Sequence, residues 1–487
     1  MRHPPRLVPL LLGGLLLAVG LLAPSPLGAA AAAPACTVEY AVTGQWDGGF
    51  QGSVKVTNNA APLSSWRLGF DFPAGQRLTQ GWGAQWSQSG GAAVSAVNES
   101  WNGTLATGAG VTLGFLASWS GANPAPSAFT LNGVVCNAGP GPTQPPGSGG
   151  APALRVSGNQ LVDASGTGRR LLGVNRSGGE FMCVQGYGIF DGPVDDTAIK
   201  AIADWGANTV RIPLNEECWL GLDNVKSEYG GSRYIAAVQD LVRRVEAHGM
   251  TPLVELHWSH GVYAGNSSAC QDIHATCQKP MPDAQYAPAF WSGVAGTFKG
   301  DPAVVFDLFN EPYPDRATSD TAAAWRCWRD GGACSGIGYE VAGMQDLLDA
   351  VRGAGATNTV LAGGLAYAND LSQWLTYQPH DPTGNLGAAW HGYNFNTCAA
   401  ESCWSSTLAP VLARVPLVAG EIGENDCGHT YIDRAMAWLD ARGASYLGWT
   451  WNTWDCSAGP ALITSYDGTA TPYGAGLRDH LRALTTS

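Results

Sequence analysis

The pattern of hydrophobic and polar residues divides the chain into two parts with different periodicity. Between residues 36 and 137, short runs such as GSVKVTN and WRLGFDF alternate apolar and polar positions, and turn-forming pairs such as NN, AG and NG separate them. A period of two places every second side chain on the same face of a strand. This part therefore predicts a small all-β sandwich.

The second part, residues 153–487, has a longer pattern in which apolar runs alternate with helical segments such as VDDTAIKAIADWGA and RYIAAVQDLVRRVEAHG. The apolar runs that we expect to form strands are residues 171–175, 208–213, 251–257, 303–309, 358–364, 387–393, 415–421 and 445–451. Eight strands alternating with helices predict an α/β fold, a (β/α)8 TIM barrel. A β-hairpin over LRVSGNQLVDASGTGRRLL is expected to precede it. The alternative, an open doubly wound sheet, would be expected to carry a Gly-rich phosphate turn after its first strand, which this sequence lacks.

Two further segments fit neither pattern. Residues 1–35 combine Arg2 and Arg6 with an apolar stretch and then small residues, which predicts a secretory signal peptide rather than a retained membrane anchor. Residues 138–152 read AGPGPTQPPGSGGAP and contain no charge and no large apolar side chain, so they predict a semi-extended linker. We expect the mature protein to be secreted, extracellular and soluble.

Composition narrows the possible partners. The chain has 26 Lys and Arg against 39 Asp and Glu, a net charge of −13. This balance argues against nucleic acid and against an anionic membrane as partners. The 12 cysteines all follow the predicted signal peptide, and an even number in an exported chain predicts disulfides. Pairing is expected within Cys36/Cys136, which bracket the first part, and within the near neighbours Cys270/Cys277, Cys327/Cys334 and Cys398/Cys403.

Candidate chemistry lies at the carboxyl ends of the predicted strands, where active sites of such barrels are found. These ends carry polar or aromatic residues that interrupt apolar runs: Arg211, His257, Asn310, Glu311, His391, Tyr393, Glu421 and Trp451. Two of them are glutamates, on the fourth and seventh strands. Hydrolysis of a glycosidic bond needs such a pair, one protonated to release the leaving oxygen and one ionised to attack or to activate water.

The motifs at these strand ends, NEP, AGEIGE, VRIP, ELHW and WHGY, resemble glycoside hydrolase family 5 over roughly residues 153–487. The resemblance implies that Glu311 is the acid/base and Glu421 the nucleophile of a retaining enzyme that needs no metal or organic cofactor. It also implies supporting roles at six positions: Asn310 on the sugar 2-OH, Arg211 and Tyr393 on the nucleophile, His257 and His391 lining the cleaved subsite, and Trp451 stacking on the sugar ring.

Several of these assignments have competitors in the sequence. Glu424 competes with Glu421, which we prefer because it ends the apolar run VPLVAG. Trp449 and Trp454 compete with Trp451, and alternation on a strand would place Trp449 and Trp451 on the same face. His257 and His260 form an HxxH pair, but the usual helix and third zinc ligand are not evident, so we expect His260 to be a hydrogen-bonded loop histidine.

The first part resembles family 2 cellulose-binding modules in the pieces GQWDGGF, SSWRLGFDF, TQGWGAQWSQSG, ESWNGTL and AFTLNG. The resemblance implies that Trp46, Trp82 and Trp101 form a flat cellulose-binding strip, because aromatic rings bury the apolar faces of sugars. Trp66 lies in an alternating run and is expected in the core, whereas Trp86 and Trp119 are undecided.

Together these features predict a secreted, retaining endo-β-1,4-glycanase, with β-linked plant cell-wall polysaccharide as its partner and cellulose as the expected substrate. Alternatives are a β-mannanase or another plant-wall β-glycanase on the same fold, and a non-catalytic carbohydrate-binding protein. The loops that would decide between substrates are residues 183–193, 215–224 and 257–277. A monomer is the expected oligomeric state.

Overall fold

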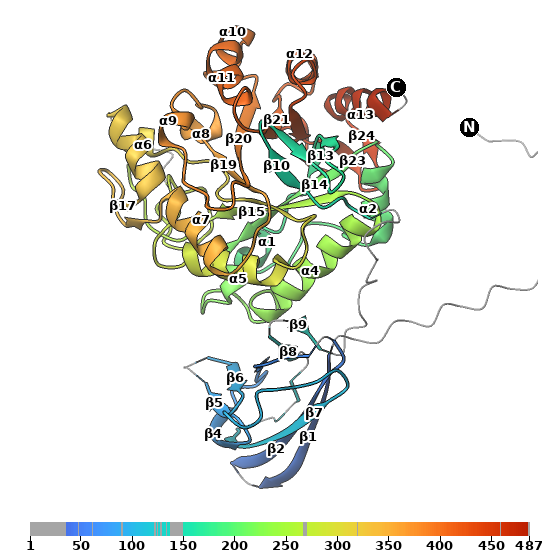
Figure 1. Cartoon of the computed structure of the whole chain (residues 1–487), viewed down its shortest axis with the longest axis vertical. Coiled ribbons are helices and arrows are strands. Elements are labelled where there is room, and N and C mark those ends of the chain that lie inside the picture. Colours follow the sequence, from blue (N-terminus) through green and yellow to red (C-terminus); the bar gives the residue numbers. More distant parts are fainter. Residues whose placement is uncertain are drawn as a thin grey trace, which may run out of the picture.

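The computed structural model describes residues 36–136 and 150–485, apart from residues 47, 61, 89–90, 121–122, 124, 127–128, 133, 266–269, 319 and 458. The predicted signal peptide and all but the end of the predicted linker lie outside the described residues. Figure 1 shows the described chain as a part built from strands and a larger part with strands and helices.

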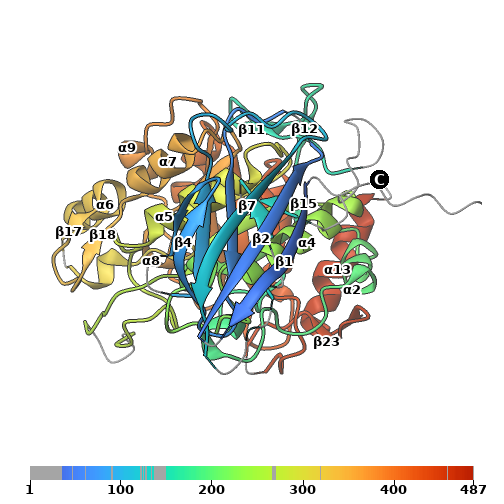
Figure 2. The same cartoon turned by 90° about the horizontal axis from the view of Figure 1, so that it is seen from below.

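The first part is a β-sandwich, as predicted, of two antiparallel sheets with strand orders β1-β2-β7-β4 and β5-β6-β3-β8-β9. Figure 2 shows β1, β2, β7 and β4 side by side. Phe50, Phe70 and Phe115 are buried between the sheets. The strands are β1 (Cys36–Trp46), β2 (Gly49–Asn58), β3 (Arg67–Asp71), β4 (Arg77–Trp82), β5 (Gln85–Ser87), β6 (Ala93–Val97), β7 (Gly110–Ser118), β8 (Phe129–Leu131) and β9 (Val134–Val135).

The second part is a closed barrel of eight parallel strands, which confirms the predicted fold class. Each of the eight predicted runs overlaps one barrel strand, and pairing of the last strand with the first closes the ring. Three strands end early, before Leu308, before Gly364 and before Trp449. The strands are β13 (Leu172–Asn175), β14 (Thr209–Asn215), β15 (Thr251–Trp258), β16 (Val305–Asp307), β19 (Val360–Gly363), β20 (Leu386–Tyr393), β21 (Leu417–Gly423) and β22 (Ser445–Gly448).

A small antiparallel sheet precedes the barrel, where we predicted a hairpin. It has three strands because the turn after the hairpin returns a third one: β10 (Arg155–Ser157), β11 (Gln160–Val162) and β12 (Gly168–Arg169). Leu154 and Leu161 pack in one cluster with the lowest inward-facing residues of the barrel, among them Leu253 and Val305. The sheet therefore covers the amino-terminal end of the barrel and leaves the opposite end for the site.

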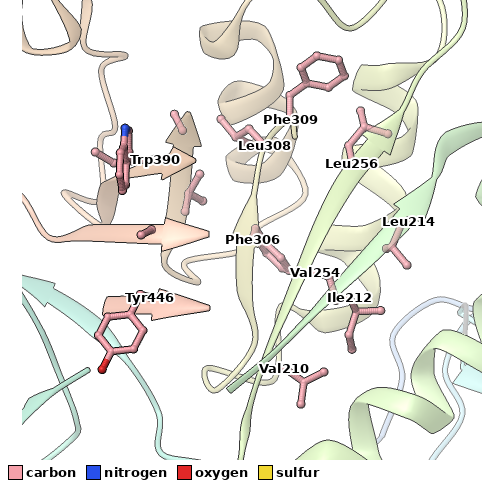
Figure 3. Close-up of a cluster of buried hydrophobic side chains, with 14 of the residues drawn as sticks. Val210, Ile212, Leu214, Val254, Leu256, Phe306, Leu308, Phe309, Trp390 and Tyr446 are labelled. Carbon is pink, nitrogen blue, oxygen red and sulfur yellow. The ribbon is translucent and has the colours of Figure 1, made fainter. Parts of the chain in front are cut away.

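Helices surround the barrel, and Figure 3 shows the apolar layer of Val210, Ile212 and Leu214 on β14 that faces them. In α4 the buried residues, such as Tyr234, Val238 and Leu241, recur at helical spacing, as the sequence pattern predicts. The helices are α1 (Met182–Gln185), α2 (Asp196–Ala203), α3 (Glu216–Leu220), α4 (Ser232–Ala247), α5 (Ala287–Phe298), α6 (Thr321–Asp330), α7 (Met344–Gly353), α8 (Leu365–Ala368), α9 (Trp374–Tyr377), α10 (Glu401–Cys403), α11 (Ala409–Leu412), α12 (Thr430–Asp440) and α13 (Pro472–Thr485).

Minor elements complete the fold. They are the pairs β17 (Gly332–Ala333) with β18 (Glu340–Val341) and β23 (Ile463–Ser465) with β24 (Thr469–Ala470), the 3-10 turn η1 (Pro314–Arg316) and the π-helical turn η2 (Trp404–Leu408). Among the helices of the described chain, none combines the length and apolarity needed to cross a bilayer.

Six disulfides use all 12 cysteines. The four predicted pairs form, and Cys36–Cys136 joins the two ends of the sandwich. The remaining cysteines, which the spacing left unassigned, pair as Cys183–Cys218 and Cys427–Cys456. Both of these pairs link residues far apart in sequence, so only the fold could select them.

The interior of the barrel changes from apolar to charged along its axis. On β15, Leu253 belongs to the lower apolar layer, whereas Glu255 and His257 follow at every second position and are buried. On β14, Arg211 faces inward between the outward-facing Val210 and Ile212. Because burying charges is costly unless they are paired, the charged upper layer marks the functional end of the barrel.

Candidate active site

Two carboxylates meet at the carboxyl ends of β16 and β21. Glu421 lies on β21, and Glu311 follows the end of β16 by four residues. One oxygen from each carboxylate and a ring nitrogen of His391 lie within 4.8 Å of one another. The His391 Nδ1 atom is 3.1 Å from Glu311 Oε1 and 3.5 Å from Glu421 Oε2. Both glutamates line a cavity of about 510 Å³.

Donors surround the Glu421 carboxylate on both oxygens. Arg211 Nη1 donates to Oε1 at 2.9 Å, and the Tyr393 hydroxyl donates to Oε2 at 2.5 Å. The guanidinium also donates to the side-chain oxygens of Asn175 at 2.9 Å and Asn310 at 3.0 Å, and it is completely buried. This network holds Glu421 in one orientation and favours its ionised form.

The two glutamates differ in how readily they lose a proton. Burial and the charge of Glu421 raise the pKa of Glu311 well above its usual value. Burial also raises the pKa of Glu421, but Arg211 and the Tyr393 hydroxyl oppose that rise. As the pH increases, Glu421 therefore ionises first while Glu311 keeps its proton, which is the division of roles that an acid and a nucleophile need.

Two histidines, both in the neutral form, flank the carboxylates. Burial, with the charge of Arg211, lowers the pKa of His391 well below its usual value, and burial lowers the pKa of His257 to about 4. The His257 Nδ1 atom is 2.5 Å from Glu255 Oε1, which orients the ring. The Trp449 ring stacks on His257 at 5.5 Å between centroids.

Three polar residues of this network escaped the sequence analysis. Asn175 ends the first predicted strand, so the strand-end rule could have found it. Glu255 and Asp307 lie one layer lower and contact Arg211 at 3.4 and 3.2 Å. Burial raises the pKa of Glu255 to about 8 and that of Asp307 to about 7. One guanidinium thus serves three carboxylates, and protonation of the lower two limits the buried negative charge.

The structure corrects the assignment of Trp451. Its side chain is completely buried and packs edge-to-face on Trp205 at 4.6 Å between ring centroids, away from the cavity. Trp449 lines the cavity instead. The expectation came from the family resemblance and from the position of Trp451 at the end of the predicted strand, but β22 ends at Gly448, so both tryptophans lie in an irregular segment beyond the strand. Trp454 is 44% exposed and contacts Phe181.

Glu424, the competitor of Glu421, has a structural role. Its two oxygens accept hydrogen bonds from the backbone N–H groups of Tyr431 at 2.9 and 3.1 Å and of Ile432 at 3.2 Å. These groups belong to the first turn of α12, so Glu424 caps that helix. Glu421, by contrast, lines the cavity.

Residues from short helical turns and loops beyond the strand ends form the remaining wall of the cavity, among them Arg316, Tyr367 and Phe395. Tyr367 lies in a left-handed segment with φ angles of 53°, 62° and 58° at Ala366, Tyr367 and Ala368. Its ring stacks on Tyr313 at 4.5 Å between centroids. No periodic signal marks such residues, which explains why the sequence analysis missed them.

A metal ion could in principle use the group Glu311, His391 and Glu421, because its donor atoms converge. However, both Glu421 oxygens already accept hydrogen bonds, from Arg211 and Tyr393. A cation would also meet the Arg211 guanidinium 2.9 Å from Glu421. The donor set therefore fits acid–base chemistry better than metal coordination.

On the sandwich, the predicted binding residues Trp46, Trp82 and Trp101 are 51%, 44% and 74% exposed. Trp46 ends β1 and Trp82 ends β4, at the two edges of one sheet. Glycines on the adjacent strands make room for both rings: a Cβ atom at Gly49 would lie 2.4 Å from the Trp46 indole, and one at Gly114 would lie 2.2 Å from that of Trp82.

Other tryptophans of the sandwich are less exposed. Trp66 is buried, as predicted, and donates to the Asn102 carbonyl at 2.7 Å. Trp86 and Trp119, which the sequence left undecided, are half-buried against the core. They therefore support the sandwich rather than extend an exposed strip.

A closed parallel barrel with two facing carboxylates at the ends of its fourth and seventh strands defines a glycosidase-like site. The family model described as Cellulase (glycosyl hydrolase family 5) matches residues 162–455, and that described as Cellulose binding domain matches residues 36–136. The chain belongs to glycosyl hydrolase family 5, and it is a glycoside hydrolase that carries a cellulose-binding module.

Individual relatives agree with this assignment. Endoglucanase CelA of Streptomyces lividans is 31% identical over 452 residues, which cover 88% of this chain and 86% of CelA. Exoglucanase A of Cellulomonas fimi is 53% identical over 111 residues, 23% of this chain and 12% of that protein. The crystal structure of the β-glucanase SdGluc5_26A from Saccharophagus degradans is similar in fold, with a TM-score of 0.52 and 19% identity over 69% of this chain and 94% of that one.

Proposed function

We propose that the protein is a secreted, retaining endo-β-1,4-glucanase that hydrolyses cellulose. The observation that carries the proposal is the distance between the two carboxylates, whose nearest oxygens are within 4.8 Å. Retaining glycosidases place their carboxyl groups about 5–5.5 Å apart, whereas inverting enzymes separate them by roughly 6.5–9.5 Å to leave room for a water molecule.

In the proposed reaction, Glu421 attacks the anomeric carbon while Glu311 protonates the departing glycosidic oxygen. The anomeric carbon–oxygen bond breaks and a glycosyl–enzyme ester forms on Glu421. Glu311, now ionised, then takes a proton from water, and the hydroxide displaces Glu421 with a second inversion. Arg211 and Tyr393 hold the nucleophile, and Asn310 beside Arg211 is placed to contact the sugar 2-OH.

The substrate assignment depends on the module as well as the barrel. CelA, which matches across both parts of this chain, is named as an endoglucanase. Trp46, Trp82 and Trp101 would stack on successive sugar faces of a cellulose surface. The predicted linker would then hold the barrel near its substrate at raised effective concentration. Secretion follows from the predicted signal peptide and is consistent with the six disulfides.

The test of the mechanism uses Glu421→Gln with Glu424→Gln as its matched control. Both residues are buried glutamates of the same segment, but only Glu421 lines the cavity. We expect Glu421→Gln to lose at least about 10⁴-fold in kcat on carboxymethyl-cellulose, the order of loss found for removal of a catalytic nucleophile, and to keep its binding to crystalline cellulose. Glu424→Gln should remain active. Activity surviving in Glu421→Gln would refute the assignment.

Two further measurements test the stereochemistry and the substrate. Proton NMR of early cellotetraose hydrolysis should show the β-anomer forming first, and an initial α-anomer would refute a retaining mechanism. Parallel assays on carboxymethyl-cellulose, mannan and xylan should favour the glucan. Higher kcat/KM on mannan would instead identify a β-mannanase on the same fold.

A further inference from the structure

A second cluster of titratable side chains lies outside the proposed catalytic pair. Glu217 is the second residue of the short helix α3, which follows β14, and His260 and His274 come from the loop between β15 and α5. The Glu217 Oε1 atom is 2.7 Å from His260 Nδ1 and 3.3 Å from His274 Nδ1. One donor atom from each residue lies within 4.8 Å of the other two.

We propose that Glu217, His260 and His274 form a zinc site on the rim of the barrel. Two imidazole nitrogens and one carboxylate oxygen make the His2Glu donor set that zinc accepts, and a water molecule would complete a tetrahedron. Hard cations such as Mg²⁺ and Ca²⁺ prefer oxygen ligands alone, so the two histidines disfavour them.

The surroundings of the cluster orient its ligands. The Glu217 side chain is completely buried, and its other oxygen accepts a hydrogen bond from Asn224 Nδ2 at 2.7 Å. This bond directs Oε1 toward the histidines, as partners of metal ligands commonly do. The backbone N–H of His260 donates to Glu216, which anchors the loop at the ligand. His274 is 40% exposed, so an ion has a path from solvent.

The local charge also favours a cation. Glu216, Glu217 and Asp283 are buried together, and Lys279 is the buried cation that interacts with all three. Glu216 and Asp283 lie side chain to side chain and share a hydrogen bond. A buried carboxylate is costly unless it is paired, and a divalent ion would pair with that of Glu217.

The ion would hold the β15–α5 loop against the start of α3. The strand β15 ends at Trp258, two residues before His260, and the disulfide Cys270–Cys277 closes the far part of the loop. His257 lines the catalytic cavity. The site would therefore stabilise the loop beside the cleft without entering the reaction.

The test titrates zinc chloride into the whole chain after dialysis against EDTA, by calorimetry and by thermal unfolding. We expect roughly one zinc per chain and a rise in Tm of several degrees at saturation. His260→Ala and His274→Ala should each weaken binding at least about 10-fold and abolish the rise in Tm. His429→Ala is the matched control: His429 is 47% exposed and pairs with Asp433 at 2.7 Å, also beside a carboxylate. It should bind zinc like the unaltered chain.

Other outcomes would overturn the proposal. Zinc binding that survives in His274→Ala and is displaced by cellotetraose would place the ion on the catalytic carboxylates instead. No zinc uptake by the unaltered chain would mean that the two imidazoles simply donate hydrogen bonds to Glu217. An anomalous zinc peak between the three side chains in a crystal would support the site directly. None of these readouts depends on hydrolytic activity.

Discussion

The two tryptophans that follow β22 should separate function from stability when each is replaced by alanine. Trp451 is completely buried against Trp205, and its indole N–H has no hydrogen-bond partner among the described residues. Its replacement removes packing alone, so Trp451→Ala should lower the free energy of unfolding by about 3–5 kcal/mol, the usual cost of a Trp-to-Ala cavity. Trp449→Ala should have a much smaller effect on stability, because that ring lines the open cavity.

For catalysis the order should be the opposite, with the larger effect at Trp449 and the smaller one at Trp451. A sugar face stacked on Trp449 would bury about 80 Å² of apolar surface, worth about 2 kcal/mol at ~25 cal/mol per Å². If that contact is retained in the transition state, Trp449→Ala should lower kcat/KM by about 30-fold. Trp451→Phe, which fills most of the cavity, should keep kcat/KM close to that of the unaltered protein.

Circular dichroism at 222 nm during urea unfolding measures the first quantity, because the helices of the described chain all lie in the barrel part. Initial rates on cellotetraose measure the second. A Trp451→Phe variant that folds with normal stability but loses about 30-fold in kcat/KM would refute the reasoning. It would return the stacking role to Trp451.

Three further predictions address other parts of the molecule. Tyr393→Phe removes a hydrogen-bond donor to the ionised form of Glu421, so the pKa of Glu421 should rise. The acid limb of the kcat/KM profile should then move to higher pH by about one unit. An unchanged acid limb would contradict this. Gly114→Val should tilt the Trp82 ring and weaken binding to crystalline cellulose about 10-fold. Hydrolysis of soluble substrate should stay unchanged. Undiminished binding to cellulose would show that the orientation of this ring is unimportant. Ala366→Gly relieves the backbone strain of an alanine at φ 53° and should raise the free energy of unfolding in urea by about 0.5–1 kcal/mol. A loss of stability would argue that the left-handed segment is unstrained.

Much of this protein could be predicted from sequence because its signals are local. Strand and helix periodicity depends on near neighbours, so all eight barrel strands could be located. The position of Glu311 and Glu421 at strand ends followed from the same runs, since parallel strands of a barrel present their carboxyl ends on one face. Nearby cysteines could also be paired, because short loops leave few alternatives.

The tertiary structure alone decided what depends on contacts across the barrel. Glu255 and Asp307 look like ordinary strand residues until closure brings them to one buried guanidinium, that of Arg211. Trp449 rather than Trp451 lines the cavity because β22 ends at Gly448, and the alternation of apolar and polar residues does not reveal where a strand ends. Residues that follow different strands, such as Glu217 in α3 and His274 in the β15–α5 loop, meet only because the fold places successive strand ends side by side. Sequence periodicity thus defines the elements and the faces that they present, whereas convergence of distant side chains is set by the closed ring.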